Sequence, residues 1–161
     1  VENLFLLPSV FIAYAKALSF DDRAAADKMN NVRAHVFVRA SEEKAPTAAR
    51  YAARRLDRLL KGVQINRASP EDLKTSFASG IAAIDVEKLL EDFETAFQDA
   101  IDSANLELLL SMFDQKGLLN FAARELGLGS TKALVQQAAR FMASGKQEEF
   151  RRAVLDALPT L

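Results

Sequence analysis

The chain has 161 residues, of which 50% are hydrophobic and 27% are charged, proportions that are ordinary for one packed globular domain. Its 21 Lys and Arg residues nearly balance its 22 Asp and Glu residues, so no overall field draws it to nucleic acid or anionic lipid, and such binding must be local. With no Cys and one His, the sequence excludes disulfides, thiolate chemistry and Cys/His zinc sites, which fits a cytoplasmic protein. No apolar run approaches the roughly 20 residues that a membrane-spanning helix needs, so we expect no membrane partner.

The start of the chain has an unusual character. It begins at Val1 rather than at Met and becomes apolar within a few residues, whereas natural termini are usually polar and poorly ordered. This pattern is typical of a cut inside a folded unit. We therefore expect residues 1–161 to be a single helical domain or lobe, a fragment of a larger protein whose missing part lies upstream.

Helical periodicity dominates the first part of the chain. Pro8 stands at a first-turn position, and the predicted helix 9–18 places four apolar side chains on one face: Val10, Phe11, Tyr14 and Leu18. Ser19 is a candidate N-cap for the following helix, which we expect to extend to about residue 41. Residues 35–38 are rich in β-branched types, so a short strand is the alternative there, although no strand partner is visible.

Three helices are predicted in the middle of the chain. The first restarts after the interruption at 45–47 and ends near Gly62, a residue type that favours a helix C-terminus. Ser69 caps the second helix, which we expect to be short because the Ser-Gly pair at 79–80 stops it. Asp85 caps the third, whose apolar residues form a stripe over five turns.

Four further helices are predicted in the last third, over 106–113, 118–126, 131–143 and 148–158, and the later ones are closed by glycines or a proline. The sequence therefore predicts an all-α fold, an irregular bundle of roughly eight or nine helices with no sheet. No repeat of the solenoid kind appears. Residues 20–84 align with no family and are a candidate insertion.

Two stripes of opposite charge lie on the long predicted helices. The helix after residue 47 carries the basic stripe, which gives the candidate nucleic-acid-binding residues: Arg50, Arg54, Arg58 and Lys61, with Arg55 beside them. The helix after Asp85 carries the acidic stripe: Glu87, Glu91, Glu94 and Gln98, with Asp92 and Asp99 near it. These stripes are either solvated faces or faces that attract each other across an antiparallel pair. In a third interpretation the arginines contact nucleic-acid phosphates, and binding would then depend on salt.

Catalytic constellations are scarce. His35 has no Ser or Asp at a telling spacing, so we interpret it as an ordinary surface or core residue. Residues 127–132 place glycines before a helix N-terminus, but a phosphate loop requires a preceding strand and the order G-x-x-x-x-G-K-[ST]. A helix C-cap joined to an N-cap explains them, and we expect this chain to hold no cofactor.

The same glycine turn leaves a helix-turn-helix domain open as an alternative. Helix 131–143 would be its second helix, after helix 118–126. Its recognition surface would be thin: Lys132, Gln136, Gln137 and Arg140.

Two segments resemble parts of one protein family. Residues 1–8, VENLFLLP, resemble the acid-Asn-aromatic-or-leucine-leucine-leucine-x-Pro segment that follows the TOPRIM-like portion of ABC/AAA-type ATPases in the overcoming-lysogenization-defect (OLD) family of nucleases. Residues 114–119, DQKGLL, followed by Ala122, Leu126 and Gly127, are similar to the family's Asp/Gly-x-Lys-x-Leu-Leu turn and helix, and 157–159 are similar to its terminal Leu-Pro. The match covers about fifteen positions, most of them apolar.

The resemblance implies a parent protein that is an ATP-dependent TOPRIM-like DNA nuclease or DNA-processing ATPase, active in bacterial defence against phage or in repair. Glu2 is then the candidate metal-facing acid, and Lys116 is the candidate catalytic lysine that faces a phosphate. The family's Asp-x-Asp strand and Walker motifs are absent, so the chain alone is not expected to be catalytic. Mg and ATP would belong to the parent, and the partners would be its upstream ATPase/TOPRIM portion and DNA.

A different class of function also fits the long helices. The chain would then be a non-catalytic protein–protein interaction module. Its mark would be an exposed apolar patch on the two long helices.

Overall fold

The computed structural model describes residues 2–145 and 147–158, except for the side chains of Glu2 and Lys116. Within these ranges the chain forms nine α-helices, one 3-10 helix and no strand, which confirms the all-α prediction. In chain order the elements are η1 (Glu2–Leu6), α1 (Pro8–Ala17), α2 (Asp22–Glu42), α3 (Lys44–Lys61), α4 (Pro70–Ala82), α5 (Val86–Asp102), α6 (Leu106–Met112), α7 (Lys116–Glu125), α8 (Thr131–Ser144) and α9 (Glu148–Asp156).

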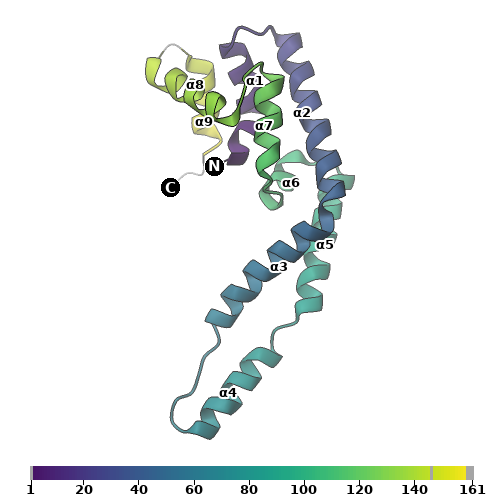
Figure 1. Ribbon diagram of the computed structural model, residues 1–161, viewed down its shortest axis with the longest axis vertical. Helices are drawn as coiled ribbons and strands as arrows, with labels where there is room; N and C mark the ends of the chain where they lie inside the picture. Colours follow the sequence, from purple (N-terminus) through teal and green to yellow (C-terminus); the bar gives the residue numbers. More distant parts are fainter. Residues whose placement is uncertain (1, 146, 159–161) are drawn as a thin grey trace.

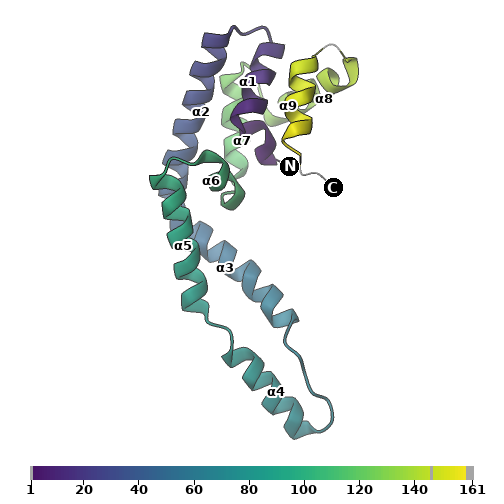
Figure 2. The same cartoon turned by 180° about the vertical axis from the view of Figure 1, so that it is seen from behind.

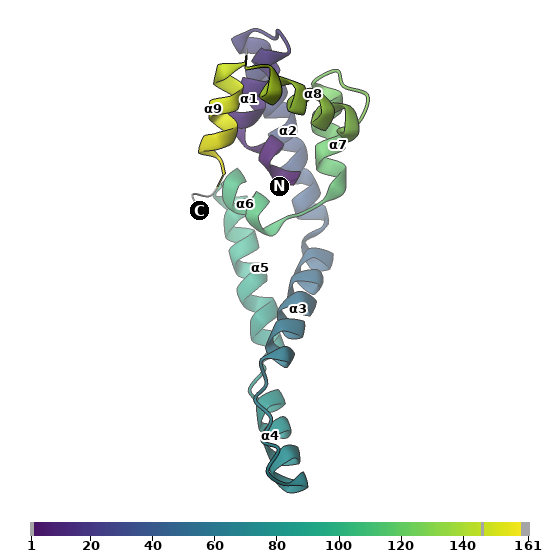
Figure 3. The ribbon, with the colours of Figure 1, turned by 90° about the vertical axis from the view of Figure 1, so that its left-hand side faces the viewer.

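The molecule consists of a body and a long arm (Figure 1). The body contains η1, α1, α2 and α6 to α9, as the view from behind also shows (Figure 2), and η1 lies close to the residues that follow α9. The arm consists of α3, α4, α5 and their links, and α4 lies at its far end (Figure 3). The end of α5 returns to the body and packs against α6. Side chains on α3 and α5 therefore lie away from most of the core.

The core of the body forms around Tyr14 in α1. Its ring centroid lies between 5.0 and 5.9 Å from those of Phe5, Phe141 and Phe150, and its hydroxyl donates a hydrogen bond of 2.9 Å to the Leu134 carbonyl. Because these residues come from η1, α1, α8 and α9, this cluster joins the first and last parts of the chain. α2 covers the other side of α1 and also packs against α7.

The cap predicted at Ser19 is wrong. Ser19 adopts a left-handed conformation with φ 73° and ends α1: its N–H bonds to the Lys16 carbonyl, and the Phe20 N–H bonds to the Ala15 carbonyl. The carboxylate of Asp21 is the N-cap of α2 and accepts a hydrogen bond from the Ala24 N–H at 2.7 Å. Because Ser19 closes α1 in the left-handed conformation, a later residue, Asp21, caps α2.

α2 continues as a helix through residues 35–38, so the strand alternative is wrong there. Val32 and Val36 lie four residues apart and are both buried, so packing against other helices stabilises a helix in spite of the β-branched residues. α3 then begins at Lys44, earlier than predicted, because Pro46 fits within a first helical turn. Gly62 follows the end of α3 as expected, although its φ of −85° is not left-handed.

α4 does not stop at the Ser-Gly pair. It runs from Pro70 to Ala82 and contains Gly80, where a Cβ would collide with the Val63 side chain. The link before α4 is also held by the Asn66 N–H, which donates to Ser76 Oγ at 3.0 Å. α4 nevertheless contributes no buried residue.

Candidate nucleic-acid interface

The basic stripe lies on the exposed side of α3. Arg50 donates a hydrogen bond of 3.0 Å to Thr47 Oγ1, and its Nη2 lies 3.9 Å from a carboxylate oxygen of Glu43. At the other end, Lys61 pairs with Asp57 at 2.6 Å. Between them the guanidinium groups of three arginines make no hydrogen bond or ion pair with any described residue: Arg54, Arg55 and Arg58. The centre of the stripe is a set of cations that face solvent.

The acidic stripe of α5 does not neutralise these arginines. α3 and α5 pack through aromatic rings, with Tyr51 and Phe93 stacked at a centroid distance of 4.4 Å and Phe93 in contact with Phe97. The one side-chain hydrogen bond between the two helices, among the residues described, joins Lys44 Nζ to Gln98 Oε1 at 3.1 Å. No ion pair connects the helices within this part of the chain, so their charged stripes are separate solvated faces.

A small cavity lies where the arm joins the body, and we call it the root cavity. It has a volume of about 170 Å³ and lies between α3, α5, the end of α6 and the α6–α7 link. Its lining residues are Thr47, Arg50, Tyr51, Arg54, Phe93, Ser111, Met112 and Asp114. Two guanidinium groups and the hydroxyls of Thr47 and Tyr51 can donate hydrogen bonds to a phosphate. The Ser111 hydroxyl already donates to the Leu108 carbonyl at 2.6 Å, and the Asp114 carboxylate opposes an anion on one side. Sequence reasoning missed this cavity because Ser111 and Asp114 are far from α3 along the chain.

The two segments that resemble the OLD family lie side by side. η1 packs against α7, and Asn3 Nδ2 donates hydrogen bonds to the carbonyls of Leu110 at 2.6 Å and Phe113 at 3.1 Å. The side chains of Glu2 and Lys116, the candidate metal ligand and catalytic lysine, lie outside the described residues. Their backbones belong to η1 and to the first residue of α7.

The start of α7 also lies next to the junction of α2 and α3. The Gln115 side chain accepts a hydrogen bond from the Gly117 N–H at 2.8 Å and donates one to Glu43 at 2.9 Å. Glu43 is the same residue that approaches Arg50. The segment that carries Lys116 therefore adjoins the root of the basic stripe.

The other chemistry-bearing positions have structural roles. His35 stacks on Phe121 at a centroid distance of 3.9 Å and an interplanar angle of 9°, in agreement with its interpretation as a packing residue. Gly127, with φ 72°, closes α7, and Ser130 caps α8 by accepting a hydrogen bond from the Ala133 N–H, as the cap-to-cap interpretation expects. Among the described side chains, which do not include that of Glu2, no group of three or more His, Asp or Glu residues is placed to hold a metal ion.

The surface of α8 matters for the helix-turn-helix alternative. Lys132, Gln136 and Arg140 are exposed, and Gln137 is half-buried. Only two of these four side chains carry a positive charge. The surface that α8 presents is as thin as expected, and the alternative stays a prediction.

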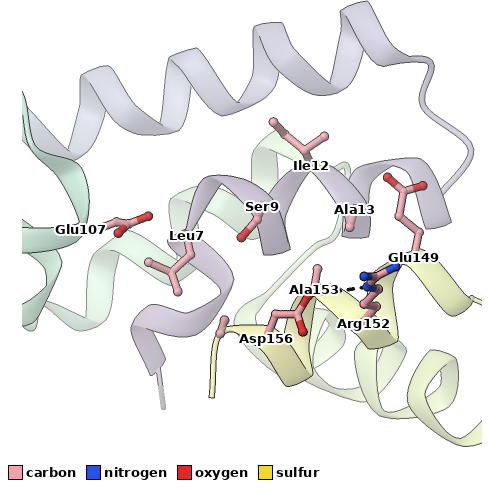
Figure 4. A pocket seen from close by; sticks show the side chains of 10 residues that line it. Leu7, Ser9, Ile12, Ala13, Glu107, Glu149, Arg152, Ala153 and Asp156 are labelled. Atoms are coloured by element: carbon pink, nitrogen blue, oxygen red, sulfur yellow. Dashed lines mark ion pairs between the residues drawn. The ribbon is translucent and has the colours of Figure 1, made fainter. Parts of the chain in front are cut away.

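A groove lies on the body between α1 and α9 (Figure 4). Its volume is about 610 Å³, and its floor contains Leu7, Ile12 and Ala153. Three carboxylates and one arginine stand around it: Glu107, Glu149, Asp156 and Arg152. Arg152 pairs with Asp156 at 3.8 Å. This excess of negative charge makes the groove unsuitable for a phosphate.

In the described part of the chain, no helix combines the length and the apolar character that crossing a bilayer requires. No family model matches the chain, and neither a curated protein nor a solved structure shows significant similarity to it.

Proposed function

We propose that this chain is a non-catalytic helical lobe of a DNA-processing ATPase of the OLD type, and that the root of α3 contacts nucleic-acid phosphates. One observation carries the proposal. Arg54, Arg55 and Arg58 have no acidic partner among the described residues, although α5, with its acidic stripe, packs against α3. Charges that serve only the fold would be expected to pair across such a contact, and solvated guanidinium groups are available for phosphate.

The root cavity supports the same function. Arg50 and Arg54 both line it, and the hydroxyls of Thr47 and Tyr51 are there to orient a phosphate oxygen. Tyr51 is 42% exposed while its other face stacks on Phe93, so it can also stack on an unpaired base.

The link to an ATP-dependent nuclease rests on the resemblance. Its two segments come together in η1 and α7, as parts of one conserved structural unit would. In this proposal ATP and Mg²⁺ are bound by the upstream portion of the parent, and Lys116 is the residue of this lobe nearest to the chemistry.

The test is binding of the chain to labelled duplex and single-stranded DNA across a salt titration. The variant Arg50→Ala/Arg54→Ala should weaken binding at every salt concentration and reduce the slope of log K against log salt by about one to two. The matched control is Arg23→Ala/Arg151→Ala, which removes two exposed charges from the body and should bind like the wild type. Lys116→Ala should weaken binding as well.

Two outcomes would contradict the proposal. The first is an absence of binding at low salt. The second is an equal loss in the root variant and in the control. A loss confined to Lys132→Ala/Arg140→Ala would instead favour the helix-turn-helix alternative.

A second function, a protein–protein interaction module, is favoured by the far end of the arm. Leu60 and Val86, on the two long helices, are 49% and 41% exposed. Phe77 of α4 is 46% exposed. If Phe77→Asp abolishes a protein contact but leaves DNA binding unchanged, the two functions belong to different surfaces.

A further inference from the structure

The arm ends in an apolar surface that the fold itself leaves uncovered. We call residues 58–87 the arm tip. Six of its large apolar side chains are between 41% and 49% exposed: Leu60, Ile65, Leu73, Phe77, Ile81 and Val86. Three of them lie four residues apart along α4 and so follow one side of that helix. Since α4 buries no residue of its own, this surface does not serve the core.

The total exposed area indicates how much of the surface is available. The chain exposes 10256 Å². A compact monomer of 17.7 kDa is expected to expose about 7,900 Å², so this chain exposes roughly 2,300 Å² more. A stable interface of standard size buries only about 800 Å² on each partner. The excess of the whole chain over a compact monomer is therefore more than one such contact would bury on each partner.

The arm tip carries both positive and negative charges, and this favours a partner whose surface also carries both. Its basic residues are Arg58, Lys61, Arg67 and Lys74, and its acidic residues are Glu71, Asp72, Asp85 and Glu87, so the tip has no net charge. A nucleic acid or an anionic membrane would meet the acids at the starts of α4 and α5. A second tip would meet no net repulsion.

The positions of these charges are also self-complementary. The basic residues Arg58 and Lys61 lie at the end of α3, and the acidic residues Asp85 and Glu87 lie at the start of α5. These two helices run side by side in opposite directions (Figure 1). A two-fold axis along the arm would place α3 of one copy opposite α5 of the other, which brings opposite charges together twice.

We propose that the arm tip docks against the arm tip of a second copy of this chain and forms a two-fold symmetric dimer. The apolar face of α4 forms the centre of the contact, and the ends of α3 and α5 form its charged rim. This inference goes beyond the proposed nucleic-acid contact. It leaves Arg50 and Arg54 at the opposite end of α3 free for phosphate.

The test is the molecular mass of the full chain, measured by sedimentation equilibrium over a range of concentrations. The wild type should have twice the mass of one chain. Phe77→Asp should be monomeric with an unchanged far-ultraviolet circular dichroism spectrum, because α4 contributes nothing to the core. Leu155→Asp is the matched control: Leu155 is 60% exposed on α9, and this variant should stay dimeric.

A charge exchange tests the symmetry of the contact. Arg58→Glu and Glu87→Arg should each weaken the dimer several-fold, and the double variant should restore it, because each change repairs the other across the interface. A monomeric wild type at every concentration would overturn the proposal and assign the face to another protein or another part of a longer chain. A dimeric Phe77→Asp, or a double variant that is weaker than both single variants, would also overturn it.

Discussion

Two residues other than glycine close helices in the left-handed conformation. Ser19 ends α1 with φ 73°, and Ala104 follows α5 with φ 49°. At Ala104 the N–H bonds to the Ile101 carbonyl, and the Asn105 N–H bonds to the Ala100 carbonyl. A side chain in this region of φ and ψ costs roughly 1–2 kcal/mol, which glycine avoids. Both turns are therefore strained at one residue.

Replacing Ala104 with Gly should stabilise the protein. The expected gain is about 0.5–1 kcal/mol, because relief of the strain exceeds the extra entropy that glycine gives the unfolded chain. The measurement is the free energy of unfolding from urea titration. Gly127→Ala is the opposite control: Gly127 has φ 72° and nothing lies within 4 Å of an added Cβ, so backbone strain alone should lower stability by a similar amount. A less stable Ala104→Gly variant would contradict this account.

Tyr14 makes the body sensitive to alkaline pH. Burial raises the pKa of Tyr14 from 10.0 to about 12, because the phenolate would lose its hydration in the core. A group whose pKa is raised on folding stabilises the native state fully below its unfolded pKa. That stabilisation is lost as the pH rises through the folded pKa. Between pH 10 and 12 we therefore expect a loss on the order of 2 kcal/mol.

The measurement is the free energy of unfolding of the wild type and of Tyr14→Phe across this range. The variant lacks the ionisable group and should lose less stability as the pH rises. At neutral pH it should be about 1 kcal/mol less stable, since the Leu134 carbonyl loses its hydrogen bond from the hydroxyl. Parallel pH profiles for the two proteins would show that Tyr14 is not responsible.

At the scale of elements, α4 depends on a glycine inside a helix. An exposed helical glycine normally costs roughly 0.5–1 kcal/mol relative to alanine. Gly80 instead allows the backbone of α4 to approach Val63 in the preceding link. Because position 80 has no side chain, α4 can pack against the link that precedes it in the arm tip.

Gly80→Ala should therefore loosen α4 instead of stabilising it. The added methyl group collides with Val63, and the expected result is faster amide hydrogen exchange across α4. Gly80→Ala/Val63→Ala should recover part of the protection because the smaller side chain makes room. Gly129→Ala, at a glycine with open space around it, should leave exchange in α4 unchanged. Slower exchange in Gly80→Ala would contradict the packing role.

At the scale of the whole molecule, the body and the arm differ in how they are held. The body buries side chains from many helices, whereas α4 contributes none to the core. The aromatic contacts Tyr51–Phe93, Phe93–Phe97 and Phe97–Phe113 connect the base of the arm to the body. The number of buried side-chain contacts that hold each helix therefore decreases from the body to the arm tip.

Hydrogen exchange of the isolated chain should follow this gradient. Amides of α1 and α7 should exchange only through global unfolding, and those of α4 should exchange through local opening at a lower free energy. Measuring both as a function of denaturant distinguishes the two mechanisms. Equal opening free energies for α4 and α1 would mean that arm and body unfold together, and strong protection of α4 that appears only at high protein concentration would support the dimer.

Local signals in the sequence determined where most helices begin. Ser69, Asp85 and Ser130 each cap the helix predicted to follow them, since an N-cap needs only a side-chain oxygen and an N–H three residues later. Periodicity also determined that the basic residues of α3 share one face, because residues four apart lie on the same side of a helix. The all-α class followed from the same local rules.

Only the tertiary structure decided which ends and surfaces these helices use. Ser19 closes α1 through backbone hydrogen bonds instead of capping α2. Gly80 lies within α4 instead of stopping it, and it packs against Val63 of the preceding link. The root cavity combines Arg54 with Ser111 and Asp114, residues that packing brings together across a long separation in the chain. The direction in which the arm extends from the body likewise depends on which apolar helix faces pack together. This is decided by the tertiary structure, and no local sequence pattern encodes it.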